Sequence, residues 1–249
     1  MTPAPILRPP HLIIPLYIYP APGAWEPLLR AARDNPGVSF LVIINPNNGP
    51  GAGPLPDANY RNVLRQLGTL GNVHLLGYVY CSYGTRSIDD TQKDIHVYWG
   101  WNSDFSVDGI FFDEVPSAKD SAGWMAGLSH FAKSLWSVNA GHSGIVVYNP
   151  GVSVGEAFYQ DADLIVTFEQ SEHQWQNWFL HQSAAENIRG KDAAMIHSCI
   201  SDARGLTRQI VEMGFGGLYL TDQLGGGYTQ WPGDWDRVLE GLDRVSKDR

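Results

Sequence analysis

The sequence predicts a single (β/α)8 barrel. Three observations support this fold class: the length of the chain, eight short apolar runs, and apolar residues at helical spacing between those runs. The chain has 249 residues, close to the ~250 typical of one such barrel. Near-continuous apolar runs are typical of parallel strands that are covered on both faces. A doubly wound open sheet is the alternative fold.

The predicted strands are runs rich in aliphatic, β-branched and aromatic residues. In chain order they are Leu12–Tyr19, Val38–Asn45, His74–Tyr80, Asp108–Glu114, Gly144–Asn149, Asp163–Glu169, Ala193–Ser198 and Gly216–Asp222. Apolar residues between them recur at helical spacing, for example Trp124, Leu128 and Phe131. Ser171 and Gln174 have the spacing of a capping box that opens a helix. No linker, repeat or low-complexity segment interrupts the pattern, so we expect one domain over residues 1–249.

Charge and hydropathy exclude two classes of partner. The net charge is −9 and only 17% of the residues are charged, so the chain offers no basic footprint for nucleic acid or an anionic membrane. A charged fraction below the usual ~25% favours neutral ligands rich in hydroxyl groups. The apolar run Leu12–Tyr19 is too short to cross a bilayer, and Met1–Pro10 lacks the pattern of a signal peptide. We therefore expect a chain without a membrane-spanning segment or signal peptide, and a monomer.

The ends of the predicted strands carry the candidate functional residues, because the active site of such a barrel lies at the carboxyl ends of its strands. Asp113 and Glu114 end the fourth run, and Glu169 ends the sixth. Since glycoside hydrolysis needs one acid and one base or nucleophile, we expect catalytic roles for these three carboxylates. Polar and aromatic side chains at other strand ends and in the loops are expected to bind a sugar: Tyr17, Tyr19, Asn45, Tyr80, Trp101, Tyr148, Asn149, His197, Asp222 and Trp231.

The alternation of side chains along a strand orients these carboxylates. On the fourth run, Phe112 is expected to face the helices, which points Asp113 toward the barrel axis. On the sixth run, Leu164 and Phe168 are expected to face the helices, which points Glu169 inward. The alternative is that the Asp-Glu pair only ends a strand and caps the next element.

The remaining features argue against other chemistry. Only one histidine and no lysine ends a predicted strand, so we expect no metal, no Schiff base and no cofactor. The glycines at 225–227 have no Lys or Arg beside them, which favours a rim loop over a phosphate site. Cys81 and Cys199 end strands that lie far apart around a barrel, so no disulfide is expected. About half of the loop aromatics are expected to touch ligand, and they are Tyr83, Trp99, Trp101, Trp175, Trp178, Tyr228 and Trp231.

Four segments together resemble the spherulin-4 family, which corresponds to glycoside hydrolase family 135. They read IIPLYIYP, VIINPNNGPG, GYVYCSYGTR and VDGIFFDEVP, and the resemblance covers essentially the whole chain. It implies a (β/α)8 barrel that cleaves internal α-1,4 linkages of N-acetylgalactosamine in galactosaminogalactan, a fungal exopolysaccharide. The essential acidic residues of the family match Asp113, Glu114 and Glu169. The resemblance also implies a secreted or cell-surface protein, although no N-terminal anchor or signal segment is visible here.

These observations leave two functional hypotheses. The first is a hydrolase in which Asp113 is the nucleophile or base, Glu169 is the general acid, and Glu114 tunes charge or holds the sugar. Strand spacing favours a retaining mechanism, although Glu114 and Glu169 could instead be the working pair. The second is a non-catalytic polysaccharide-binding protein of a cell wall or spore surface on the same barrel. A lyase or isomerase of phosphorylated metabolites is disfavoured because no basic phosphate site is visible.

Overall fold

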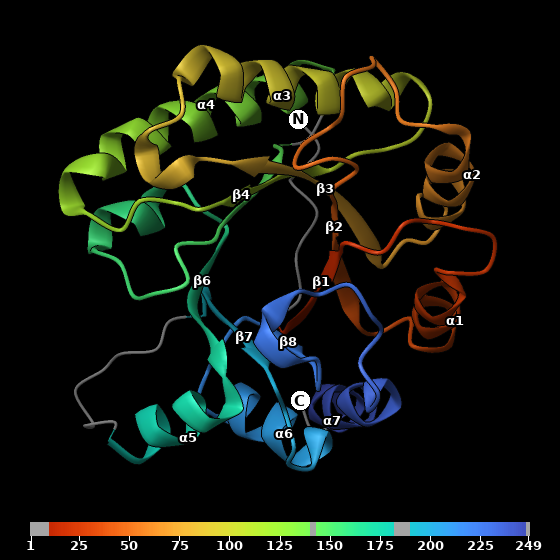
Figure 1. Ribbon diagram of the computed structural model, residues 1–249, viewed down its shortest axis with the longest axis vertical. Coiled ribbons are helices and arrows are strands. Elements are labelled where there is room, and N and C mark those ends of the chain that lie inside the picture. The colour runs from red at the N-terminus through yellow and green to blue at the C-terminus, as the bar shows by residue number, and fades with distance from the viewer. Residues whose placement is uncertain (1–9, 140–142, 182–189, 248–249) are drawn as a thin grey trace.

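A computed structural model describes residues 10–139, 143–181 and 190–247 of the protein. Eight parallel strands close into a barrel in chain order, and the helices lie outside it (Figure 1). The predicted fold class is confirmed. The strands are β1 (His11–Leu16), β2 (Ser39–Ile44), β3 (Val73–Tyr80), β4 (Gly109–Asp113), β5 (Ile145–Tyr148), β6 (Leu164–Ser171), β7 (Asp192–His197) and β8 (Gly217–Leu220).

Helices connect most of the strands. They are α1 (Glu26–Asp34), α2 (Ala58–Leu67), α3 (Ile88–Gly100), α4 (Ala122–Asn139), α5 (Glu172–His181), α6 (Ala203–Glu212) and α7 (Trp235–Lys247). A 3-10 helix, Glu156–Gln160, stands between β5 and β6 in place of an α-helix. In the described residues, no helix has both the length and the apolar composition needed to cross a bilayer.

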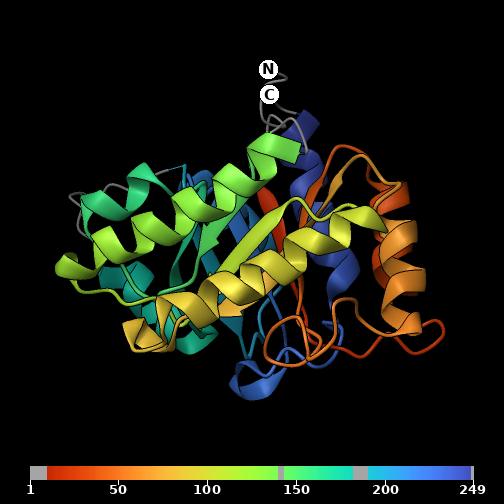
Figure 2. The same cartoon turned by 90° about the horizontal axis from the view of Figure 1, so that it is seen from above.

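The strands are buried on both faces, as the apolar runs indicated. Every residue of β1, β5 and β8 is buried. The barrel closes where β1 pairs with β8, with His11 opposite Gly217 and Leu12 opposite Leu218. Figure 2 shows α3 and α4 side by side on the outside of the barrel. The close approach of α3 requires Gly77, since a Cβ there would overlap the ring of Tyr98.

The predicted orientation of β4 agrees with the structure. The ring of Phe112 meets that of Tyr148, and the hydroxyl of Tyr148 reaches Ser129 in α4, so both side chains face the helices. Asp113 therefore points into the barrel mouth, where it contacts the hydroxyl of Tyr78.

The predicted orientation of β6 is wrong at its start and right at its end. Leu164 lies inside the barrel: a Cβ on Gly217 would stand 2.8 Å from Leu164 Cδ2 and 3.3 Å from Ile13 Cδ1, and side chains of β1, β6 and β8 can meet only in the interior. A β-bulge between Val166 and Phe168 then shifts the register. An added residue reverses the alternation, so Phe168 packs outward on Trp175 and Trp178 of α5 and Glu169 still points inward.

Candidate active site

A bridged pair of carboxylates lies at the carboxyl ends of the strands. Asp113 is the last residue of β4, Glu169 lies near the end of β6, and Asn149 directly follows β5 between them. Asn149 Nδ2 donates to Asp113 Oδ1 at 2.8 Å and to Glu169 Oε2 at 2.7 Å. These two oxygens are therefore no more than about 5.5 Å apart, the limit set by the two distances.

Each carboxylate also accepts a hydrogen bond from one phenol. Tyr78, which lies on β3, donates to Asp113 Oδ2 at 2.8 Å. Tyr228, in the loop after β8, donates to Glu169 Oε1 at 2.7 Å. The ring of Tyr17, just after β1, contacts both phenol rings, with centroids 5.7 Å from Tyr78 and 6.2 Å from Tyr228. A continuous hydrogen-bonded chain thus runs across the barrel mouth from β3 to the loop after β8.

Burial and hydrogen bonding act in opposite directions on the two carboxyl groups. Burial raises the pKa of Asp113, and hydrogen bonds from Tyr78, the Glu114 backbone and Asn149 partly offset the rise. Burial also raises the pKa of Glu169; Tyr228 and Asn149 offset it, while the charge of Asp113 adds to it. Asp113 has three donors and Glu169 has two, so Asp113 is the more strongly stabilised anion.

The phenols of the site are held neutral. Burial, followed by the negative charge of the carboxylates, raises the pKa of Tyr17 and Tyr228 well above the usual value for tyrosine. Burial and the neighbouring Asp113 raise the pKa of Tyr78 in the same way. These hydroxyls therefore remain hydrogen-bond donors at any physiological pH.

Glu114 turns the chain out of β4 in a strained conformation. Its φ is +51°, in the left-handed region that residues with a Cβ rarely adopt. Its carbonyl accepts a 2.7 Å hydrogen bond from the backbone N–H of Tyr83, which is left-handed too. In the described residues, every non-glycine with positive φ follows a barrel strand: Asn48, Ser82, Tyr83, Glu114, Ser198 and Tyr228. Backbone strain is thus concentrated at the carboxylate face, as is common at functional sites.

Two predicted sugar contacts are wrong because the side chains are buried in the core. Trp101 follows α3, at the opposite end of the barrel from the strand ends, and it packs on Tyr98 and Phe105. Tyr148 faces outward, where its hydroxyl bonds Ser129 and the Met125 carbonyl. Neither ring reaches the surface, since Trp101 is 0% and Tyr148 is 1% exposed.

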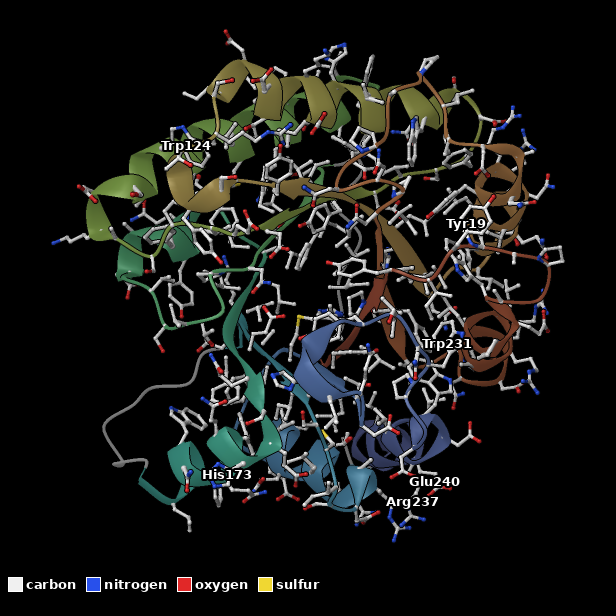
Figure 3. All side chains as sticks on the ribbon, in the orientation of Figure 1. Tyr19, Trp124, His173, Trp231, Arg237 and Glu240 are labelled. Atoms are coloured by element: carbon white, nitrogen blue, oxygen red, sulfur yellow. The ribbon has the colours of Figure 1, made fainter. Side chains whose placement is uncertain are left out.

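Two further predicted contacts lie toward the outer rim, beside α1 and α2 (Figure 3). The hydroxyl of Tyr19 donates to Asp57 and accepts from Asn59 at the start of α2. Trp231 donates its Nε1–H to the Ala24 carbonyl at 2.7 Å. Both side chains therefore tie loops together, and their roles as sugar contacts stay predictions.

The other predicted contacts stand at strand ends and already have partners in the protein. Asn45 Oδ1 accepts from the Gly49 N–H, and the ring of Tyr80 lies 4.0 Å below the guanidinium of Arg86. His197 pairs with its neighbour Ser198, and burial lowers its pKa. Asp222 is exposed and accepts from the Gly233 N–H. Their roles as sugar contacts stay predictions.

Tyr78 is a site residue that the sequence reasoning missed. It lies inside β3 and not at its end, so attention to strand ends passed over it. Strand register would have identified it. Tyr78 is two residues before Tyr80, and it is paired with Phe111, which lies on the inward side of β4 with Asp113, so Tyr78 also faces inward. Among the residues that the structure describes, no group of three His, Cys, Asp or Glu side chains is arranged to hold a metal ion.

The fold and the site define a class of protein: a (β/α)8 barrel with a carboxylate pair in its mouth, the arrangement found in many glycoside hydrolases. Comparison with known families then places the chain. The model of spherulation-specific family 4, Spherulin4, matches residues 11–242, so the chain belongs to this family.

Two relatives support the assignment. Spherulin-4 of Physarum polycephalum is 30% identical over 230 residues, which cover 88% of this chain and 65% of that protein. The chain thus spans just under two thirds of the length of that relative. The crystal structure of Aspergillus clavatus Sph3 in complex with GalNAc superposes with a TM-score of 0.82 at 32% identity, covering 94% of this chain and 97% of Sph3.

Proposed function

We propose that the protein is a glycoside hydrolase that cleaves internal α-1,4 linkages of a polysaccharide containing N-acetylgalactosamine, such as galactosaminogalactan. The observation that carries the proposal is the Asp113–Asn149–Glu169 bridge, which holds one oxygen of each carboxyl group within about 5.5 Å of the other. Retaining glycosidases have carboxyl groups about 5–5.5 Å apart. The substrate class follows from the similarity to Sph3, whose structure contains GalNAc.

The donors around each carboxyl group assign the roles. Asp113 Oδ1 accepts from two amide N–H groups, those of Glu114 and Asn149, which cannot turn to accept a proton. Asp113 is therefore favoured as the ionised nucleophile. Glu169 accepts from only one such amide N–H, and its other oxygen accepts from the Tyr228 hydroxyl as Asp113 Oδ2 accepts from that of Tyr78, so Glu169 has one fixed N–H donor fewer. Glu169 is therefore favoured as the group that carries the proton, the general acid.

Glu114 is assigned to the sugar and not to the bond that breaks. It follows Asp113 at the start of the loop, and its side chain is partly exposed. A partly exposed carboxylate beside the pair is suited to accept hydrogen bonds from sugar hydroxyls. A polymeric substrate of this kind lies outside the cell, so we place the activity at the cell surface or in the medium.

The test is incubation with purified galactosaminogalactan followed by mass spectrometry of the oligosaccharides released. We expect N-acetylated oligosaccharides from the wild type and a loss on the order of 10²-fold or more in D113N and E169Q. Pull-down of the polysaccharide by the same variants separates a hydrolase from a binding protein. If the wild type binds the polysaccharide but releases no oligosaccharides, the hydrolase proposal is wrong, and a non-catalytic wall or spore-surface protein is favoured.

A further inference from the structure

Asn149 has no hydrogen-bond donor left for a sugar. Its two N–H groups are used by Asp113 Oδ1 and Glu169 Oε2, and an amide nitrogen has only two. Its Oδ1 is buried and accepts no hydrogen bond from the described residues, and the residue is only 6% exposed. The expectation of a sugar contact therefore does not fit the geometry of this side chain.

The backbone fixes Asn149 between the two carboxylates. Its N–H donates to the Phe112 carbonyl at 2.7 Å, and its carbonyl accepts from the Val115 N–H at 3.1 Å, so it is bonded to β4 and to the turn after it, on both sides of Asp113. Two residues later, the Gly151 carbonyl accepts from the Glu169 N–H at 3.1 Å. The proline that follows Asn149 restricts it to an extended conformation, and Gly151 supplies the left-handed turn. The Asn-Pro-Gly sequence thus attaches one amide group to both β4 and β6.

We propose that Asn149 is a positioning residue that sets the separation and the order of ionisation of Asp113 and Glu169. The proposal rests on the proposed function, because positioning matters only where the two carboxyl groups act on one substrate. Two anions this close repel each other, and the partly positive amide group between them lowers that repulsion. The amide also favours an ionised Oδ1 on Asp113 and leaves Oε1 of Glu169, on the side of Tyr228, as the position for the transferable proton.

The test combines a titration with kinetics. We would follow the side-chain carboxyl ¹³C signals of Asp113 and Glu169 by NMR across pH, assigning them with D113N and E169Q. N149A removes one donor from each group, and we expect both titration midpoints to rise by about 1–2 pH units. We expect kcat on galactosaminogalactan to fall by roughly 10- to 100-fold, because a small misplacement of reacting groups has a large effect on rate. KM should stay nearly unchanged.

Two further variants keep the test decisive. N149D preserves the shape of the side chain but replaces its donors by a third carboxyl group, so it also raises both midpoints even if N149A folds poorly. Asn72→Ala is the matched control: the two N–H groups of the Asn72 amide are shared among three backbone carbonyls, of Ala32, Asn35 and Val38, and the amide touches neither carboxylate. N72A should lower Tm and leave both midpoints and the pH profile unchanged.

The outcomes separate the possible roles of Asn149. A rise in KM with unchanged midpoints would mean that Asn149 binds the sugar after all. A fall in Tm alone, as in N72A, would mean that it only supports the fold. Either result overturns the proposal. Because the NMR titration needs no turnover, it tests the Asn149 bridge even in a protein that fails to hydrolyse the polysaccharide.

Discussion

Replacing Tyr228 by Phe isolates one hydrogen bond to the proposed general acid. The Tyr228 hydroxyl donates to Glu169 Oε1 at 2.7 Å, and a hydrogen bond to a charged group contributes about 1.5–3 kcal/mol. At 1.36 kcal/mol for one pKa unit, its loss should raise the pKa of Glu169 by about 1–2 units. Burial already raises this pKa, so the two effects have the same sign. A general acid must be protonated, and the alkaline limb of kcat/KM should therefore move to higher pH by the same amount.

The assay is the pH dependence of kcat/KM on galactosaminogalactan, with Y78F as the opposite case. Tyr78 donates to Asp113, which must be ionised for attack. Y78F should raise the pKa of Asp113 and move the acid limb of the profile to higher pH. The active pH range should therefore become narrower in Y78F and wider in Y228F. Tyr148→Phe is the control, since Tyr148 is buried but bonded to Ser129 on the helix side; it should lower Tm and leave both limbs in place. A Y228F profile that moves only on its acid side would show that the roles of Asp113 and Glu169 are reversed.

The remaining predictions concern stability and binding. The folded-state pKa of Glu169 lies above its unfolded value, so the ionisation of Glu169 destabilises the fold as pH rises. E169Q should therefore raise Tm at pH 7, by about 2–4 °C for each kcal/mol of stability regained. Thermal melts of E169Q below about pH 4 should show no gain over the wild type, because Glu169 is protonated there in both the folded and the unfolded state. Tyr83 is 67% exposed and has a left-handed backbone, which Asn tolerates well. Y83N should therefore keep Tm and weaken polysaccharide binding by about 1–3 kcal/mol, because the aromatic ring is lost. Calorimetry measures this affinity, and an unchanged affinity would exclude a stacking role for Tyr83. Trp101→Ala should cost about 3–5 kcal/mol of unfolding free energy in denaturant titration, whereas a sugar platform would cost binding and little stability. G77A should destabilise by about 1–3 kcal/mol in the same titration, because the new Cβ meets Tyr98, and no effect would show that α3 can move away.

The sequence was sufficient to predict the strand order and the inward orientation of Asp113 and Glu169. It was not sufficient to predict why Glu169 points inward, because that depends on a bulge in β6. Strict alternation placed Leu164 outside, whereas it lies in the barrel interior. The bulge before Phe168 corrects the alternation, and nothing in the local composition of β6 signals it. A bulge depends on how a strand pairs with its neighbour, and pairing is not visible in a single strand.

Helix ends limited the prediction of the aromatic residues. Trp101 was expected near the strand ends because the boundary of the preceding helix was unknown; α3 ends at Gly100, which places Trp101 at the opposite face. Tyr228 was correctly counted among the loop aromatics, but its contact with Glu169 depends on a left-handed backbone that its residue type does not indicate. Such contacts are set by tertiary structure and not by local propensity.

The stereochemistry of the reaction is the final prediction, and it depends on the distance between carboxyl groups. Inverting enzymes hold them about 6.5–9.5 Å apart to admit a water molecule, and retaining enzymes about 5–5.5 Å apart. The Asn149 bridge limits Asp113 Oδ1 and Glu169 Oε2 to about 5.5 Å, which is below the separation that an inverting pair needs. The distance therefore favours direct attack by Asp113.

We accordingly expect retention through a glycosyl–Asp113 intermediate, with Glu169 first donating a proton to the leaving oxygen and then accepting one from water. An α-linked substrate should release the α-anomer first, and ¹H NMR of the anomeric region during the first minutes can detect it before mutarotation. A β-anomer formed first would exclude this mechanism. It would also point to a pair with Glu114, whose position after the turn at φ +51° is not constrained by Asn149.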